Sequence, residues 1–309
     1  MRAGSHSKAS STRPTIYQVV LLAAFLCLGP LKDGEAFAQG ENPVDLQLVI
    51  ALDVSTSMDR GERKLQRDGF AAAFRDPDIL RAIQHGPNRR IAVAVMEWAG
   101  ETRQNVVLDW TELGNAADMA TFADRLEGRI PGRMASGTAV GAAMLRAALL
   151  FGESPYDGGR RIINISGDGL SNRGPDPALV RDLLIANGIT INGLPIVYQN
   201  PLRGVAEPRA GSPPRPETLI RYFEERVIGG VGAFVEPVME ISQFDAAIRR
   251  KLIREIRGPF DIAEHGRAIP PKAQAAVAST SAPDAEAAVR MAATTWPIAA
   301  RSRAEGPPR

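Results

Sequence analysis

Short apolar runs alternate along this chain with longer stretches in which apolar residues recur every three or four positions. The runs are rich in aliphatic and β-branched residues, which is typical of strands, and they lie at residues 46–52, 90–99, 105–110, 162–165, 189–197 and 233–238. The helical spacing is found at residues 114–126, 139–150, 175–186, 217–227 and 242–256, with a further helix after Asp59. This alternation predicts an α/β fold in which a mostly parallel sheet is covered by helices on both faces.

Two of the expected strands depart from the parallel pattern or lie at its margin. Only about five residues separate the run at 90–99 from the run at 105–110, which is too few for a crossover and predicts an antiparallel hairpin. Residues 233–238 contain Pro237, which cannot donate a ladder hydrogen bond, so this run is expected at an edge. The prediction is therefore a six-stranded sheet with one antiparallel strand.

A polar cluster follows the first strand directly. Asp53, Ser55 and Ser57 occupy alternate positions, at the strand end where open α/β sheets place their ligand sites. One carboxylate and two hydroxyls are hard oxygen ligands, which suit Mg²⁺, Mn²⁺ or Ca²⁺ and fit Zn²⁺ or Cu²⁺ poorly. The same residue types are also the usual N-caps of helices, and a helix follows here. Taken alone, the cluster supports either interpretation.

Two further stretches bear on this choice. Ser136, Gly137 and Thr138 precede a helix made of small residues, and the strand at 162–165 is followed by a Ser-Gly-Asp-Gly turn that contains Asp168. With these, residues 44–258 resemble the von Willebrand factor type A (vWA) domain. Its metal-ion-dependent adhesion site uses a DxSxS motif, then a loop threonine, then a loop aspartate. The matching positions in this sequence are Asp53, Ser55, Ser57, Thr138 and Asp168.

The resemblance implies a fold and a function. The fold is a doubly wound, Rossmann-like vWA sheet with strand order 3-2-1-4-5-6, in which strand 3 is antiparallel. Asp53 and Asp168 then lie beside each other at the topological switch point. The function is that of a cation-dependent adhesion or assembly module without enzymatic activity. A bound divalent cation, Mg²⁺ in the first place and otherwise Mn²⁺ or Ca²⁺, captures an acidic side chain of a protein partner through its open coordination position.

Two other functions fit parts of the sequence. A strand ending in Asp-x-Ser faintly resembles metal-dependent phosphatases, whose strand ends in DxD, but Ser55 stands where their acid/base aspartate would be. Serine hydrolysis has no GxSxG motif, and the histidines are His6, His85 and His265, with His85 expected in a loop at the far end of the sheet. Apart from these enzymes, the other alternative function is that of a scaffold protein whose metal site is not used.

The chain begins with the features of a secretory signal. Basic residues at 2–13 precede a short apolar core at 19–28, and Ala-Phe-Ala at 36–38 provides a cleavage site. The core is too short to span a membrane comfortably and is broken at Pro30, so an uncleaved anchor is the less favoured alternative. Cleavage after residue 38 predicts a periplasmic or secreted protein, and it removes Cys27, the single cysteine of the chain.

Charge and composition narrow the remaining possibilities. The net charge is +2 over 309 residues and no long basic run occurs, so nucleic acid is not expected as a partner. Residues 39–43 are expected to be a flexible lead, and residues 199–216 a long loop. From residue 259 to 309 Ala, Pro, Ser and Arg dominate, which predicts a disordered tail.

Overall fold

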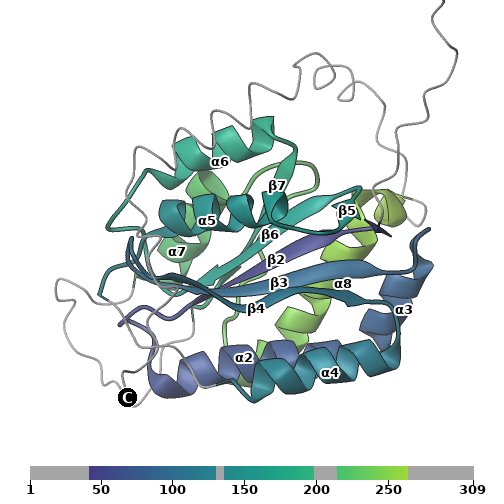
Figure 1. Ribbon diagram of the computed structural model, residues 1–309. Helices are drawn as coiled ribbons and strands as arrows, with labels where there is room; N and C mark the ends of the chain where they lie inside the picture. Colours follow the sequence, from purple (N-terminus) through teal and green to yellow (C-terminus); the bar gives the residue numbers. More distant parts are fainter. Residues whose placement is uncertain (1–41, 130–135, 198–213, 264–309) are drawn as a thin grey trace, which may run out of the picture. The chain divides into compact units, whose positions relative to one another are not determined.

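The computed structural model describes residues 42–129, 136–197 and 214–263 (Figure 1). The predicted signal segment, most of the predicted loop at 199–216 and most of the predicted tail therefore lie outside the described residues. The main sheet is formed by β2 (Gln47–Asp53), β3 (Ile91–Trp98), β4 (Gln104–Leu113), β6 (Arg161–Gly167) and β7 (Ile189–Pro195). A separate parallel pair joins β1 (Pro43–Val44) to β5 (Asp157–Gly158).

The strand order of the main sheet is β4-β3-β2-β6-β7, which places the first long strand in the centre. All neighbours run parallel except β3 and β4, which form the antiparallel hairpin. In chain order this is 3-2-1-4-5, which agrees with the order that the vWA resemblance implies except for its sixth strand. The helices are α2 (Arg60–Arg75), α3 (Pro77–His85), α4 (Ala116–Glu127), α5 (Val140–Gly152), α6 (Pro177–Ala186), α7 (Pro216–Tyr222) and α8 (Phe244–Ala263), with a π-helical turn η2 (Phe223–Val227) and a 3₁₀ turn η3 (Ile241–Gln243).

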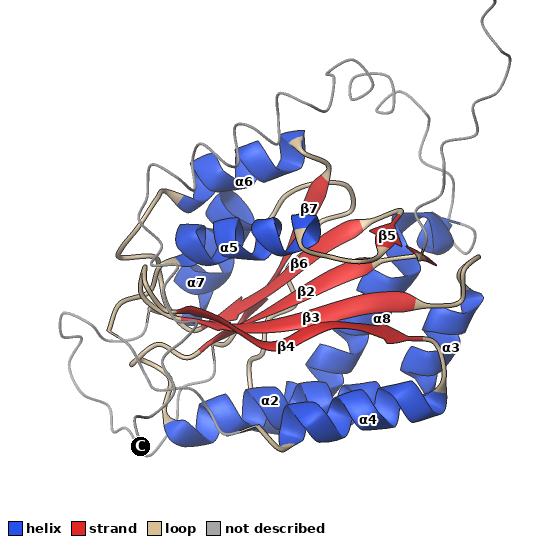
Figure 2. Cartoon of the chain, in the orientation of Figure 1, coloured by secondary structure: helices blue, strands red, loops and turns tan. Residues whose placement is uncertain are grey.

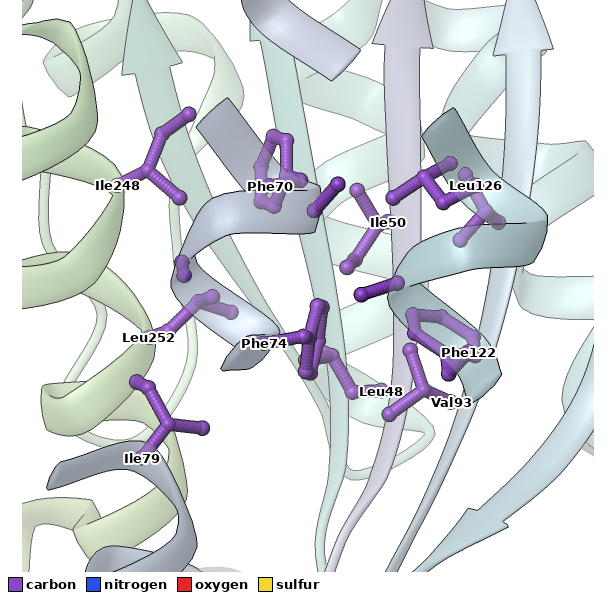
Figure 3. Close-up of a cluster of buried hydrophobic side chains, with 14 of the residues drawn as sticks. Leu48, Ile50, Phe70, Phe74, Ile79, Val93, Phe122, Leu126, Ile248 and Leu252 are labelled. Carbon is purple, nitrogen blue, oxygen red and sulfur yellow. The ribbon is translucent and has the colours of Figure 1, made fainter. Parts of the chain in front are cut away.

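The helices form a layer on each face of the sheet (Figure 2). Side chains of α2, α3, α4 and α8 pack on one face, where Phe74 and Phe122 meet edge to face with ring centroids 4.8 Å apart (Figure 3). Side chains of α5, α6 and α7 pack on the other face, together with Trp98 and Trp110. β2 and β3 contribute to both clusters, which explains why their sequences are apolar throughout.

The predicted sixth strand does not form a continuous strand. Residues 233–238 run beside β7 but touch it through isolated bridges, between Gly193 and Val235 and between Ile196 and Val238. Gly193 accepts the N–H of Glu236 and Pro195 accepts the N–H of Val238, but Pro195 has no N–H to donate back to residue 236. The ladder is interrupted at Pro195, and the prediction of six strands was wrong by one.

Two helix ends differ from the sequence interpretation. His85 is the last residue of α3 rather than part of a loop. It still lies at the end of the sheet away from Asp53, because the adjacent Gly86 approaches Asp45, just before β2 begins. α8 extends beyond the predicted boundary at residue 258, with a break at Gly258, whose φ is 77°. Among the described helices, none is long and apolar enough to cross a membrane.

Candidate functional site

The candidate site lies where β2 and β6 end side by side. These strands are parallel neighbours, Asp53 is the last residue of β2, and Asp168 follows β6 directly. After β2 the chain enters α2 on one face of the sheet, whereas after β6 it enters α6 on the other face. The two aspartates therefore flank a topological switch point, where open α/β sheets bind their ligands.

Four of the five residues singled out in the sequence form one hydrogen-bonded chain. The backbone N–H of Ser55 donates to Asp53 Oδ1 at 2.7 Å, and Ser57 Oγ donates to Asp168 Oδ1 at 2.6 Å. The two serine hydroxyl oxygens are 2.9 Å apart. Residues 55–57 thus connect two carboxylates that come from strands far apart in the sequence.

The helix that follows does not use these residues as caps. Asp59 is the N-cap of α2: its Oδ1 accepts the N–H of Glu62 at 2.9 Å, and the Glu62 carboxylate accepts the N–H of Asp59 at 2.7 Å. This capping box satisfies the start of α2 without any help from residues 53–57. The capping alternative for the Asp-x-Ser-x-Ser cluster is therefore excluded.

Asp53 is in an unusual environment for a carboxylate. It is fully buried, and its Oδ2 has no hydrogen-bond partner among the described residues. Burial and, after it, the negative charge of Asp168 raise the pKa of Asp53 from 3.8 to about 7, although hydrogen bonds from Ser55 and from the backbone of Asp168 lower it. A second carboxylate next to an unpaired buried oxygen is unfavourable without a compensating positive charge.

Backbone packing keeps space open beside that oxygen. A Cβ atom at Gly167 would lie 3.1 Å from Asp53 Oδ2 and 3.3 Å from Trp98 Cζ2, so a larger residue would crowd the carboxylate. Gln66 of α2 donates to the carbonyl of Asp53 at 3.1 Å and thereby holds the end of β2. No sequence pattern singles out Gln66, because a glutamine within an amphipathic helix is an ordinary polar residue.

Thr138 reaches the same region from the segment before α5. A Cβ atom at Gly169 would lie 3.7 Å from Thr138 Oγ1, which places the threonine hydroxyl beside the loop that carries Asp168. Thr138 is itself buried. The structure therefore brings all five predicted residues to one end of the sheet.

The donor set fits a hard divalent cation. Asp53 Oδ2 is orphaned, two carboxylates lie close enough to repel each other, and neutral hydroxyls surround them. A divalent cation would remove the repulsion and satisfy the orphaned oxygen. Within residues 42–129, 136–197 and 214–263, no group of three or more His, Cys, Asp or Glu is arranged for metal binding. The candidate set contains two carboxylates and three hydroxyls, so it does not belong to that class.

Solved structures with similar folds include proteins of several sources. The proximal thread matrix protein 1 of the mussel byssus matches with 14% identity and a TM-score of 0.46, covering 70% of this chain and 49% of that chain. It is also described in a form in which zinc occupies its metal-ion-dependent adhesion site (MIDAS) motif. The von Willebrand factor type A protein from Catenulispora acidiphila matches with 17% identity and a TM-score of 0.44, covering 69% and 43%.

The pilus adhesin SpaC from Lactobacillus rhamnosus GG, in its open conformation, matches with 13% identity and a TM-score of 0.49, covering 71% of this chain and 30% of that chain. The chain thus spans less than half the length of each of these three proteins. At these identities the likeness is one of the α/β fold alone.

No curated protein matches the chain significantly. A family model described as a protein of unknown function, DUF1194, matches residues 43–260, which include β2, β6 and every candidate site residue. The chain belongs to the DUF1194 family, whose function its description leaves open.

Proposed function

We propose that this protein is a periplasmic or secreted binding module that holds a divalent cation and captures an acidic side chain of a partner protein. The observation that carries the proposal is the orphaned, buried Oδ2 of Asp53 beside a second aspartate and three hydroxyl side chains. The resemblance to the vWA adhesion site, based on the same five positions, supports the same function.

Each residue has a defined role in this proposal. Asp53 and Asp168 supply negative charge, and Ser55, Ser57 and Thr138 supply neutral oxygens. Two carboxylates balance the charge of a divalent cation, so that the neutral hydroxyls leave it able to attract a further anionic ligand. When bound, the cation supplies an open coordination position for a carboxylate. Mg²⁺ is the cation of first choice, and Mn²⁺ and Ca²⁺ suit the same ligand types.

The partner is expected to be a protein that offers an exposed Asp or Glu side chain. Catalysis by this site has little chemical support, because position 55 is a serine and supplies no acid for proton transfer. His85 is held at the opposite end of the sheet, as described above. The observations therefore favour a binding module over a phosphatase-like hydrolase.

Affinity capture from a native extract tests this function. The mature chain as bait is expected to retain a partner in millimolar Mg²⁺ and to release it in EDTA. Asp53→Asn, which removes the charge but keeps the side-chain shape, is expected to retain no partner in either buffer. Asp182→Asn is the matched control, since the Asp182 side chain is 63% exposed on α6 and pairs with Arg181.

The outcomes separate the possible functions. A partner captured equally in Mg²⁺ and EDTA would contradict the metal mechanism and favour a scaffold. A partner captured by the wild type and by Asp182→Asn only with Mg²⁺, and not by Asp53→Asn, would support the proposal. Competition by free glutamate or by an acidic peptide would then identify the carboxylate as the recognised group.

Metal binding is expected to depend on pH around neutrality. The pKa of Asp53 in the metal-free protein is about 7, so at pH 6 most molecules must lose a proton before a cation binds. We expect the affinity for Mg²⁺ or Mn²⁺ to rise by up to about tenfold per pH unit below pH 7 and to level off above it. Calorimetric titration between pH 5.5 and 8.5 measures this, and an affinity that does not change with pH would contradict it.

A further inference from the structure

The segment that carries Thr138 is joined to the loop after β6 through Asn172 and through Ser171, whose hydroxyl donates to the Thr138 carbonyl at 3.3 Å. The Oδ1 of Asn172 accepts the backbone N–H of Thr138 at 2.9 Å. The backbone N–H of Asn172 donates to the carbonyl of Thr138, also at 2.9 Å. Both main-chain polar groups of Thr138 are therefore paired with one residue that lies four positions after Asp168.

The same segment is held on its other side by the end of β3. Ala139 donates its N–H to the carbonyl of Ala99 at 2.9 Å. A Cβ atom at Gly100 would lie 2.5 Å from the carbonyl oxygen of Ser136, so the two backbones touch. Gly137, which lies between Ser136 and Thr138, has a φ of 94°, a left-handed conformation that few residues other than glycine adopt. The turn before Thr138 is thus fixed by contacts from both flanks.

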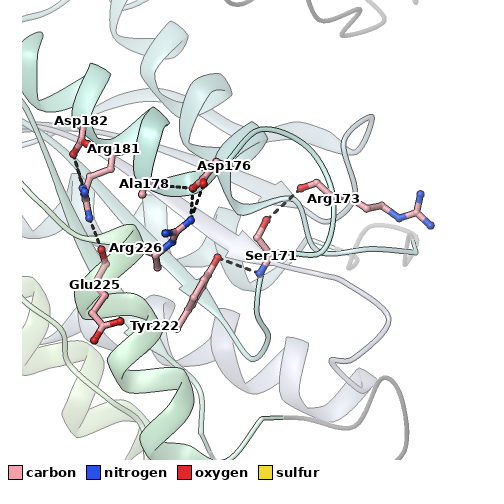
Figure 4. Close-up of polar contacts among 9 residues, drawn as sticks. All are labelled: Ser171, Arg173, Asp176, Ala178, Arg181, Asp182, Tyr222, Glu225 and Arg226. Carbon is pink, nitrogen blue, oxygen red and sulfur yellow. Dashed lines mark hydrogen bonds and ion pairs between the residues drawn. The ribbon is translucent and has the colours of Figure 1, made fainter.

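The loop that carries Asn172 is itself braced by the α7–η2 segment (Figure 4). The backbone N–H of Ser171 donates to the hydroxyl of Tyr222 at 3.1 Å. Asp176, the N-cap of α6, accepts two hydrogen bonds from Arg226 at 2.8 and 2.7 Å. Asn172 therefore sits on a loop whose position is set on both sides of it, and it can transmit that position to Thr138.

Holding the main chain of Thr138 also orients its side chain. A β-branched residue has few χ1 rotamers for a given backbone conformation, so a fixed backbone leaves few directions for the hydroxyl. The hydroxyl of Thr138 lies beside Gly169, next to Asp168. The Asn172 contact thus limits the directions in which this candidate oxygen ligand can point.

We propose that Asn172 is a positioning residue that holds the Thr138 hydroxyl in the candidate cation site through two hydrogen bonds to the threonine main chain. The inference rests on the proposed metal-binding function and extends it to a residue outside the five-residue set. Residues that orient metal ligands without touching the metal commonly change its affinity about 10–100-fold when they are removed.

The test compares Mn²⁺ binding by the wild type and by two Asn172 variants, using calorimetry at pH 8. Asn172→Ala removes the acceptor for the Thr138 N–H and is expected to weaken Mn²⁺ binding about 10–100-fold. Asn172→Asp keeps an acceptor oxygen at the same position and adds negative charge, so it is expected to bind at least as tightly as the wild type. Asn105→Ala is the matched control, because Asn105 is also an exposed asparagine but lies on β4. It is expected to leave the Mn²⁺ affinity unchanged.

A second measurement reports on the contact itself. Amide hydrogen exchange at Thr138 is expected to be faster in Asn172→Ala than in the wild type and to be restored in Asn172→Asp. The melting temperature of the metal-free protein is expected to stay close to the wild-type value in both variants, because Asn172 is an exposed residue.

The outcomes distinguish this inference from the function on which it rests. If the wild type binds no Mn²⁺, the proposed function itself fails. If the wild type binds Mn²⁺ and Asn172→Ala binds it equally well, the positioning role is overturned while the metal site stands. Binding by Asn172→Asp as weak as that of Asn172→Ala would also overturn it, because the acceptor oxygen would then have no effect.

Discussion

Replacing Glu255 by alanine is expected to lower the free energy of unfolding by about 3–5 kcal/mol, the usual cost of breaking a buried ion pair from one side. Glu255 and Lys251 lie one turn apart on α8, and both side chains are fully buried. The Lys251 ammonium donates to Glu255 Oε1. Burial lowers the pKa of Lys251, while the charge of Glu255 raises it. Without Glu255, the buried ammonium would lose the carboxylate that it contacts.

The sheet completes this buried network. Asn164 of β6 donates to Glu255 Oε2 at 2.9 Å, and Asn192 of β7 donates to Glu255 Oε1 at 3.1 Å. The side-chain Oδ1 of Asn192 in turn accepts the backbone N–H of Phe234 at 3.1 Å. Glu255→Ala therefore also leaves two buried amide groups without their acceptor, which adds to the destabilisation.

Urea unfolding followed by circular dichroism measures this effect. Glu153→Ala is the matched control, because the Glu153 side chain is 56% exposed and its ion pair with Arg146 is at the surface. The control is expected to cost at most about 1 kcal/mol. A free energy of unfolding for Glu255→Ala within about 1 kcal/mol of the wild-type value would contradict the burial of the Lys251–Glu255 ion pair.

The second large effect concerns the metal response of Asp53→Asn. Saturation with Mg²⁺ or Mn²⁺ at 100 times the dissociation constant is expected to stabilise the wild type by about 2.7 kcal/mol. For a domain of this size, that stabilisation corresponds to a rise in melting temperature of roughly 5–10 °C. Asp53→Asn is expected to show no rise, because the side chain that lies at the centre of the ligand set has lost its charge.

Without metal, Asp53→Asn is expected to be at least as stable as the wild type near neutral pH. Because the folded-state pKa of Asp53 is raised above 3.8, the folded wild type holds a proton that the unfolded chain has lost. Its stability in EDTA should therefore fall as the pH rises from about 4 to 7, by at most about 1.4 kcal/mol per pH unit. Asp53→Asn lacks this loss and should be no less stable than the wild type at pH 8. A variant that unfolds in EDTA at pH 8 would contradict this account of Asp53.

Much of the fold could be predicted from local patterns. Buried parallel strands are continuous apolar runs, so β2 and β3 stand out, and the short connection between β3 and β4 allows only an antiparallel pairing. The six-strand prediction failed at residues 233–238, because an apolar run does not show where its partner lacks N–H groups. Pro195 in β7 becomes relevant only once the two segments are adjacent.

The candidate site was predictable to the same extent. Asp53, Ser55 and Ser57 lie within five residues, and a strand end followed by hydroxyls and a carboxylate is a local signal. Asn172 and Gln66 carry no such signal. Their contacts connect positions 34 and 13 residues apart, and each residue type at its position is ordinary for an exposed loop or a helix. Only the folded backbone shows that they hold the ligand-bearing segments.

The buried network of α8 was hidden for a related reason. A lysine and a glutamate four residues apart on an amphipathic helix usually form a surface pair. Here the helix turns them toward Asn164 and Asn192, and two asparagines within apolar strands were the only sequence feature that distinguished the site. Neither asparagine identifies its partner without the packing of α8 on the sheet.

The most direct test of the proposed function is a calorimetric titration of the wild type and of Asp53→Asn with Mn²⁺ at pH 8. We expect one saturable Mn²⁺ site per wild-type chain and no measurable binding to Asp53→Asn. A wild type that binds no Mn²⁺, or an Asp53→Asn protein that binds it equally well, would contradict the assignment of the strand-end carboxylates and hydroxyls to a cation site.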